Sequence, residues 1–283
     1  MSAVWMIVAS LLFAFMGVCV KLGSTQFTPG EIVFYRGGIS VLMMGFAATI
    51  GRVSLLTPHW RMQLSRGAAG SLALMCYFFA IGILPLATAV TLNYTSPIFV
   101  ALVLAIAFGE RLRPAVLISV LTGFAGVVLL LRPSLQPEQW LGALAGLSSG
   151  MIASLAYVSV RELGRAGEPE VRTVFWFSVL TSLLGLGWAL MGDLHLPDAR
   201  GAATMLGVGL FGGLAQLAMT RSYRFGRTVV SANLSYATVL FASLFGMLVW
   251  GEAVTAAGWM AMALIVGSGV MVSLATRPRP APG

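Results

Sequence analysis

Long apolar stretches follow one another along the whole chain, separated by short breaks that contain charged residues, proline or glycine. Because the hydrocarbon core of a bilayer is roughly 30 Å thick, a helix needs about 20 mostly apolar residues to cross it. Backbone groups in lipid must be bonded internally, and the period-2 alternation of a membrane β-barrel is absent, so the stretches predict ten helices. The predicted spans are residues 3–22, 30–50, 67–84, 86–108, 114–131, 140–160, 171–191, 201–220, 228–250 and 256–275.

The breaks between these spans carry residues that begin or end helices. Pro29 precedes the second predicted helix, Pro85 precedes the fourth, and Pro114 opens the fifth. Arg132 and the proline after it close the fifth helix. Residues 277–283 cannot continue a helix, so we expect a disordered cytoplasmic tail.

Composition leaves no room for a water-soluble domain. Hydrophobic residues make up 58% of the chain and charged residues only 9%, whereas a soluble domain carries about 25% charged residues. The net charge of +8 comes mainly from arginines in the breaks. They do not gather on one face with aromatic neighbours, so nucleic acid is not an expected partner and the lipid bilayer is.

The basic residues also predict the orientation of the helices. Cytoplasmic loops of membrane proteins are enriched in Lys and Arg. With a cytoplasmic N-terminus, the opposite side holds only Lys21, Arg132 and Arg200, and the first segment lacks the features of a cleaved signal peptide. We therefore expect a multi-pass protein of the bacterial cytoplasmic (inner) membrane with both termini cytoplasmic. The cytoplasmic loops and tail then hold Arg52, Arg61, Arg66, Arg111, Arg113, Arg161, Arg165, Arg172, Arg221, Arg224, Arg227, Arg277 and Arg279.

An internal repeat divides the chain into two halves. Residues 92–110 align without gaps on residues 234–252. Each half holds five predicted helices, an odd number, so the second copy must be inverted relative to the first. Inverted repeats are the architecture of secondary transporters, with the substrate site near the membrane midplane. We place the first repeat at residues 1–134 and the second at 135–276. The matched pairs are Leu92 and Leu234, Tyr94 and Tyr236, Phe99 and Phe241, Gly109 and Gly251, and Glu110 and Glu252, the two glutamates being expected at the membrane interface or as caps.

The repeat resembles the EamA-domain family of the drug/metabolite transporter superfamily. The resemblance rests on residues 83–133 and on the opening segment, residues 6–37, and it covers nearly the whole chain as two copies. The second copy is more divergent, with Val239 in place of Pro97. The resemblance implies a ten-helix carrier, in most cases an exporter of amino acids or other metabolites. It also implies a central cavity lined mainly by the first, third, fourth, sixth, eighth and ninth helices. The opening segment is similar to carriers of opine-type metallophores.

Enzyme chemistry is not expected, and neither a catalytic residue, a metal nor a cofactor is predicted. His59 and His195 lie in loops on opposite sides, so they cannot share a metal. Gly142, Gly146 and Gly150 form a stripe of small residues on the sixth helix, which indicates close helix packing rather than a phosphate loop.

Charges at membrane depth require an explanation, because each costs roughly 2.5–3.5 kcal/mol at a helix centre on insertion scales. Arg36 lies about six residues into the second helix, and Phe177 takes its place in the second repeat. We expect Arg36 to be a structural or gating charge that bonds carbonyls or another helix, with contact to an anionic substrate group as the alternative. Glu31 is grouped with Arg36 as a structural charge, and we expect it, like Lys21, to reach the interface.

Polar and aromatic residues near the midplane are the candidate substrate ligands, although such residues also serve as hydrogen-bonding links between helices. Pro97 adds a free backbone carbonyl to the group on the fourth helix. The candidates cluster on helices that the resemblance assigns to the cavity. They are Tyr77, Asn93, Tyr94, Ser96, Tyr157, Gln216, Asn233 and Tyr236.

The sequence thus predicts an all-α membrane protein that moves a small molecule by alternating access. The expected substrate is a small polar organic metabolite, an amino acid or its derivative, with an opine-type metallophore as a narrower possibility, and the expected direction is export. A passive channel or facilitator is the alternative, because no buried acid clearly couples a proton. A receptor or assembly subunit is a third class. We expect a monomer or a homodimer.

Overall fold

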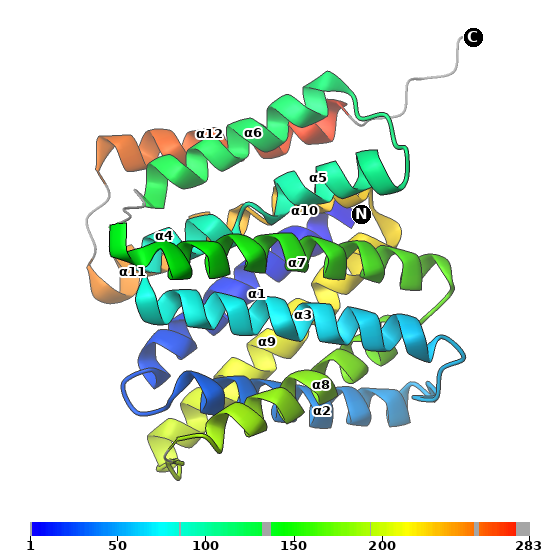
Figure 1. The fold of residues 1–283 in the computed structure, drawn as a ribbon, viewed down its shortest axis with the longest axis vertical. Helices are drawn as coiled ribbons and strands as arrows, with labels where there is room; N and C mark the ends of the chain where they lie inside the picture. The colour runs from blue at the N-terminus through cyan, green and yellow to red at the C-terminus, as the bar shows by residue number, and fades with distance from the viewer. Residues whose placement is uncertain (1, 85, 132–136, 193, 252–254, 276–283) are drawn as a thin grey trace.

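The computed structural model describes residues 2–84, 86–131, 137–192, 194–251 and 255–275. Glu252 and the predicted tail lie outside these residues. The described part contains no strand, and its helices stack side by side in one bundle (Figure 1). They are α1 (Ser2–Gly23), α2 (Pro29–Ile50), α3 (Trp60–Ile83), α4 (Leu86–Asn93), α5 (Ser96–Ala107), α6 (Pro114–Leu131), η1 (Pro137–Gln139), α7 (Trp140–Arg165), α8 (Glu170–Ala189), α9 (Ala199–Phe225), α10 (Thr228–Leu234), α11 (Ala237–Trp250) and α12 (Ala256–Ala275).

The predicted all-α membrane fold is confirmed, with two of the ten spans interrupted. The span predicted at 86–108 is two helices, α4 and α5, and the span at 228–250 is also two, α10 and α11. Counting each interrupted span once, eight spans of the described residues are long and apolar enough to cross a membrane. With α3 and the shorter α6 they make up the ten predicted spans.

Both interruptions fall at matching positions of the repeat and have a local chemical basis. Pro97 lies in the first turn of α5 and has no N–H to donate back to α4. The Thr95 hydroxyl donates to the carbonyl of Leu92 at 2.6 Å. At the second interruption, the Ser235 hydroxyl donates to the carbonyl of Ala232 at 2.7 Å. Each hydroxyl binds a carbonyl at the helix end, as membrane burial requires.

The helices pack mainly across the two halves of the chain. The most extensive helix pairs are α2 with α8, α1 with α9, α3 with α7, and α6 with α12. Exchanging the two halves converts the α1–α9 pair into the α7–α3 pair and leaves the other two pairs unchanged. This is the pattern that an inverted repeat produces. In Figure 1 the α6–α12 pair forms one edge of the bundle and the α2–α8 pair forms the other.

Glycines bring α2 and α8 into backbone contact. A Cβ atom at Gly37 would lie 2.7 Å from Cα of Ser182, and one at Gly185 would lie 2.6 Å from the backbone nitrogen of Phe34. Side chains at these positions would force the helices apart, so the two glycines fix their separation.

The glycine stripe on α7 also serves close packing, as predicted. A Cβ at Gly142 would lie 2.9 Å from Leu84, and one at Gly150 would lie 2.9 Å from the carbonyl oxygen of Leu92. Gly146 faces the same surface, so α7 packs tightly against α3 and α4.

One end of the bundle holds the start of α1 and the end of α12 (Figure 1). We call it the terminal end. The loops between α2 and α3 and between α7 and α8 lie at this end. The turns after α5 and α11 match in conformation, because Gly109 and Gly251 have φ values of 62° and 65°, where a side chain would be strained.

Candidate functional site

A small cavity lies where the middle of α2 meets α8 and α9. Its volume is about 10 Å³, which is close to the minimum that holds one water molecule. Its walls combine one cation with hydroxyls and an amide, and these neutral groups can both donate and accept hydrogen bonds. The lining residues are Arg36, Gly37, Ser40, Phe177, Ser178, Thr181, Gly212 and Gln216.

Arg36 is buried at this cavity, with 8% of its surface exposed. Its Nε atom has no hydrogen-bond partner, and none of the ion pairs within the described residues includes its guanidinium. The guanidinium carbon lies 5.8 Å from the centre of the Phe177 ring. The interhelical hydrogen bond expected of Arg36 is therefore not seen in the described part of the chain.

Arg66 is a second buried arginine beside the first, and its predicted place in a cytoplasmic loop was wrong. Helix α3 begins at Trp60, earlier than the predicted residue 67, so Arg66 lies in its second turn. Arg66 is 2% exposed, and neither Nε nor Nη1 has a partner. Its guanidinium carbon lies 4.3 Å from the centre of the Phe177 ring. Arg36 and Arg66 therefore contact the same aromatic ring, and we call these three residues the arginine cluster.

The carboxylates of the described residues are engaged elsewhere. Five glutamates form ion pairs, and none of these pairs involves the arginine cluster. Asp198 caps α9 by accepting a hydrogen bond from the Gly201 N–H, and Glu138 is exposed in η1. The paired glutamates are Glu31, Glu110, Glu162, Glu168 and Glu170.

Two predicted ligands lie near the arginine cluster. Gln216 lines the cavity, and its Nε2 atom is buried without a partner. Tyr157, on α7, lies in the neighbourhood of both Arg36 and Arg66. Its ring stacks on that of Tyr223, with the ring centres 5.2 Å apart.

A second group of predicted ligands meets at the two helix interruptions. The rings of Tyr94 and Tyr236 tilt against each other, with their centres 6.3 Å apart. Asn93 donates to the Ser149 hydroxyl at 3.0 Å. These contacts join the two halves of the chain at the interruptions.

Two more predicted ligands, Ser96 and Asn233, also lie at the interruptions, and Tyr77 lies on α3. Tyr77 packs beside Phe78 and against a small apolar cluster of α3 and α4. Ser96 is buried at the start of α5. Asn233 faces the Ser268 hydroxyl at 3.5 Å. Five of the eight candidates therefore lie at the two interruptions, and two lie near the arginine cluster.

Glu31 is buried in protein at the start of α2, and its position at the membrane interface stays a prediction. It is 1% exposed and belongs to the capping box of α2, where it accepts hydrogen bonds from the N–H and hydroxyl of Thr28. It also accepts from the backbone N–H of His195, and the His195 Nδ1 atom lies 3.2 Å away. Glu31 thus joins the start of α2 to the loop after α8.

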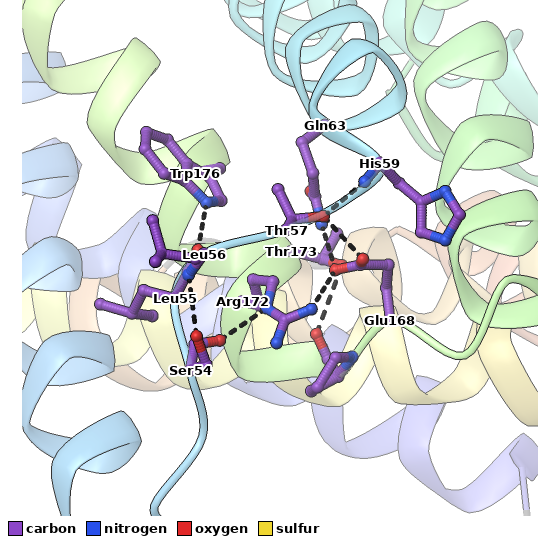
Figure 2. A network of polar contacts seen from close by, with 11 residues as sticks. Ser54, Leu55, Leu56, Thr57, His59, Gln63, Glu168, Arg172, Thr173 and Trp176 are labelled. Atoms are coloured by element: carbon purple, nitrogen blue, oxygen red, sulfur yellow. Dashed lines mark hydrogen bonds and ion pairs between the residues drawn. The ribbon is translucent and has the colours of Figure 1, made fainter.

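A polar network at the terminal end joins the loop after α2 to the start of α8 (Figure 2). Glu168 is buried at its centre and accepts from the Thr57 hydroxyl at 2.7 Å. The Gln63 amide and Arg172 Nη1 each donate to the same carboxylate at 3.0 Å. Arg172 Nε donates to the carbonyl of Ser54 at 2.7 Å. Hydrogen bonds hold the pKa of Glu168 below its ordinary value, although burial alone would raise it.

The two polar contacts at the loop ends occupy matching positions. Glu31 and Arg172 are related by the sequence offset that relates Arg36 to Phe177, and so are Ser54 and His195. Near the start of each helix, one charged side chain therefore holds the loop that follows the partner helix. The chemistry is opposite, because Glu31 accepts from an N–H whereas Arg172 donates to a carbonyl.

The cavity differs from the one that the resemblance implied, since it is lined by the second, seventh and eighth of the ten spans. Sequence reasoning missed Arg66 and Phe177 as members of a site. The available signal was the repeat, which set Phe177 opposite Arg36, although it could not show that the two residues touch.

Comparison with known proteins gives matches along nearly the whole chain. The EamA-like transporter family matches residues 1–132 and 140–274. The pseudopaline exporter CntI of Pseudomonas aeruginosa is 30% identical, over 95% of this chain and 92% of its own. The aromatic amino acid exporter YddG of Ancylobacter novellus is 29% identical, over 87% of each chain. A crystal structure that is 24% identical has a TM-score of 0.88 and covers 98% of this chain and 99% of its own.

Proposed function

Because this chain belongs to the EamA-like transporter family of the drug/metabolite transporter superfamily, we propose that it exports a small polar organic metabolite by alternating access. It is a multi-pass protein of the bacterial inner membrane. Its relatives are transporters, so a role as an enzyme has no support from them.

The observation that carries the proposal is the pair of interrupted helices. Transporters with inverted repeats use discontinuous helices at the interface of the repeats, where exposed backbone groups and side chains can meet a substrate. In this chain α4–α5 and α10–α11 are interrupted at matching positions, and Tyr94 touches Tyr236 between them. We propose the other predicted ligands as substrate contacts for the same reason.

The substrate we propose is an amino acid or an amino-acid derivative. Two relatives carry names of exporters, one for pseudopaline and one for aromatic amino acids, and both align over most of this chain. An opine-type metallophore is the narrower class within this proposal.

Counterflow in proteoliposomes tests the proposal. Vesicles loaded with an excess of unlabelled aromatic amino acid should accumulate the labelled compound transiently, and the initial rate should saturate. Flux that neither saturates nor responds to the trans side would instead favour the passive channel. Absence of flux with any amino acid or derivative would contradict both.

We also propose that both termini are cytoplasmic. Arg165 is exposed at the end of α7, and Leu196 is exposed in the loop between α8 and α9. A cysteine at Arg165 should be protected from an impermeant thiol reagent in intact cells, whereas one at Leu196 should react. The reverse pattern would overturn the orientation.

A further inference from the structure

The arginine cluster holds two cations without an anion. Removing a charge from water is expensive, and a buried charge without a partner destabilises the fold that contains it. Arg36 and Arg66 are both buried, and neither forms an ion pair within the described residues. Each guanidinium also repels the other. Charged residues at membrane depth that have no structural partner are by default functional.

The protein compensates only part of this cost. Phe177 offers its ring to both guanidinium groups, at 5.8 Å and 4.3 Å. A cation–π contact is weaker than the hydrogen bonds and counter-charge that a buried cation loses on leaving water. The Nε atoms of both arginines and Nη1 of Arg66 still lack partners. At least three charged donors are therefore free.

We propose that the arginine cluster binds a carboxylate of the transported molecule, with Arg36 and Arg66 as its ligands. A guanidinium presents paired N–H donors that match the two oxygens of a carboxylate. The Nε2 donor of Gln216 lies at the cavity that Arg36 and Phe177 line, and it is also without a partner. The positive charge together with these free donors favours an anionic group over a cationic one.

The cavity as it stands is closed to this group. A volume of about 10 Å³ suits one water molecule and is smaller than a carboxylate. Binding therefore requires the Phe177 ring or the start of α3 to move, and the anion then replaces the aromatic contact. These two steps couple occupancy of the site to a conformational change. Alternating access requires such a coupling. The inference rests on the proposed transport function in one respect, which is that the bound anion belongs to the transported molecule.

Thermal unfolding of the purified protein tests the charge argument without any ligand. Arg36→Met and Arg66→Met replace an unpaired buried cation by an apolar side chain of similar length. Each variant should melt about 2 °C or more above the unaltered protein, since removing an uncompensated charge stabilises the fold. Arg200→Met removes the same charge from an exposed position and should leave the melting temperature unchanged. A lower melting temperature for both cluster variants would show that the arginines are structural, and would overturn the proposal.

Binding of defined probes tests the ligand class. Succinate and benzoate, each at constant ionic strength, should stabilise the unaltered protein more than succinamide and benzamide do. The apparent affinity for the carboxylates should fall about tenfold or more in Arg36→Met and in Arg66→Met, because each removes charge-assisted hydrogen bonds. Arg36→Lys should restore it only in part, since an ammonium lacks the planar fork. Equal effects of acids and amides, or stabilisation by inorganic phosphate alone, would contradict a carboxylate site.

The two proposals fail in different measurements. If proteoliposomes show no flux while the carboxylates still bind in detergent, the transport function is wrong and the anion site stands. If counterflow is intact in the double variant Arg36→Met/Arg66→Met, transport stands and the carboxylate assignment is wrong.

Discussion

Glu168 holds the loop after α2 against the start of α8, so its substitution by glutamine should release that loop. The carboxylate is buried and accepts three hydrogen bonds, from Thr57, Gln63 and Arg172. Glutamine keeps the shape, but its amide nitrogen cannot accept a hydrogen bond. At least one of the three bonds is lost, and Arg172 loses its counter-charge.

The size of the effect follows from the bond to Arg172. A hydrogen bond to a charged group contributes roughly 1.5–3 kcal/mol. Because 1.4 kcal/mol corresponds to a factor of ten, local opening of the loop should become about 10- to 150-fold more frequent in Glu168→Gln. The loop amides depend on this contact directly. For example, the His59 N–H donates to the Thr57 hydroxyl, which itself donates to Glu168.

Hydrogen exchange measured by mass spectrometry on peptides from residues 53–63 reports the opening. Glu138→Gln is the matched control, because Glu138 is exposed in η1. Exchange in this segment should rise in Glu168→Gln and stay unchanged in the control. Identical exchange in the two variants would refute the reasoning.

Acid should release the same loop. The pKa of Glu168 is lowered below its ordinary value of 4.5 because hydrogen bonds and the charge of Arg172 outweigh burial, which alone would raise it. A carboxyl with a lowered pKa in the folded state stabilises that state above the ordinary pKa, and the stabilisation is lost as the pH falls through the folded pKa. Protection should thus be constant from neutral pH to about 4.5 and decrease below it, and Glu168→Gln should lack this phase.

Two further contacts can be tested by thermal unfolding. The double-mutant cycle of Tyr94→Ala and Tyr236→Ala should give a coupling of about 0.5–1.5 kcal/mol, as aromatic pairs do, and additive effects would show that the contact contributes nothing. Gly37→Ala should cost about 1–3 kcal/mol by overpacking, because its Cβ would lie 2.7 Å from Cα of Ser182. Gly187→Ala, with nothing within 4 Å, should be neutral or stabilising, and equal losses at both glycines would contradict the packing argument.

The sequence predicted the helices well because bilayer thickness imposes their length. It predicted the interruptions less well. Pro97 explains the first interruption. The second repeat has Val239 at that position, and no single residue there predicts the interruption before α11. The second interruption becomes understandable only through the symmetric packing of the halves, which a local pattern does not contain.

Charged residues were the least predictable because their burial is decided by distant segments. Arg66 stands next to an apolar stretch and resembles a loop residue, yet Phe177 from the other repeat covers it. Glu31 stands at a helix start near a short loop, and the loop carrying His195 buries it. Hydropathy along the chain predicts whether a segment lies in lipid or in water. These side chains are instead buried against other parts of the protein, which hydropathy does not predict.

The pairing of helices across the two halves has a consequence for biosynthesis. Helix α1 packs most extensively against α9, and α3 packs most extensively against α7. A nascent chain that has inserted the first five spans therefore lacks the principal partners of nearly all of them. Those spans lack these partners until α7, α8, α9 and α12 have been synthesised. During that interval the charge of Arg36 is not yet covered by the residues of α8 and α9 that surround it in the complete fold.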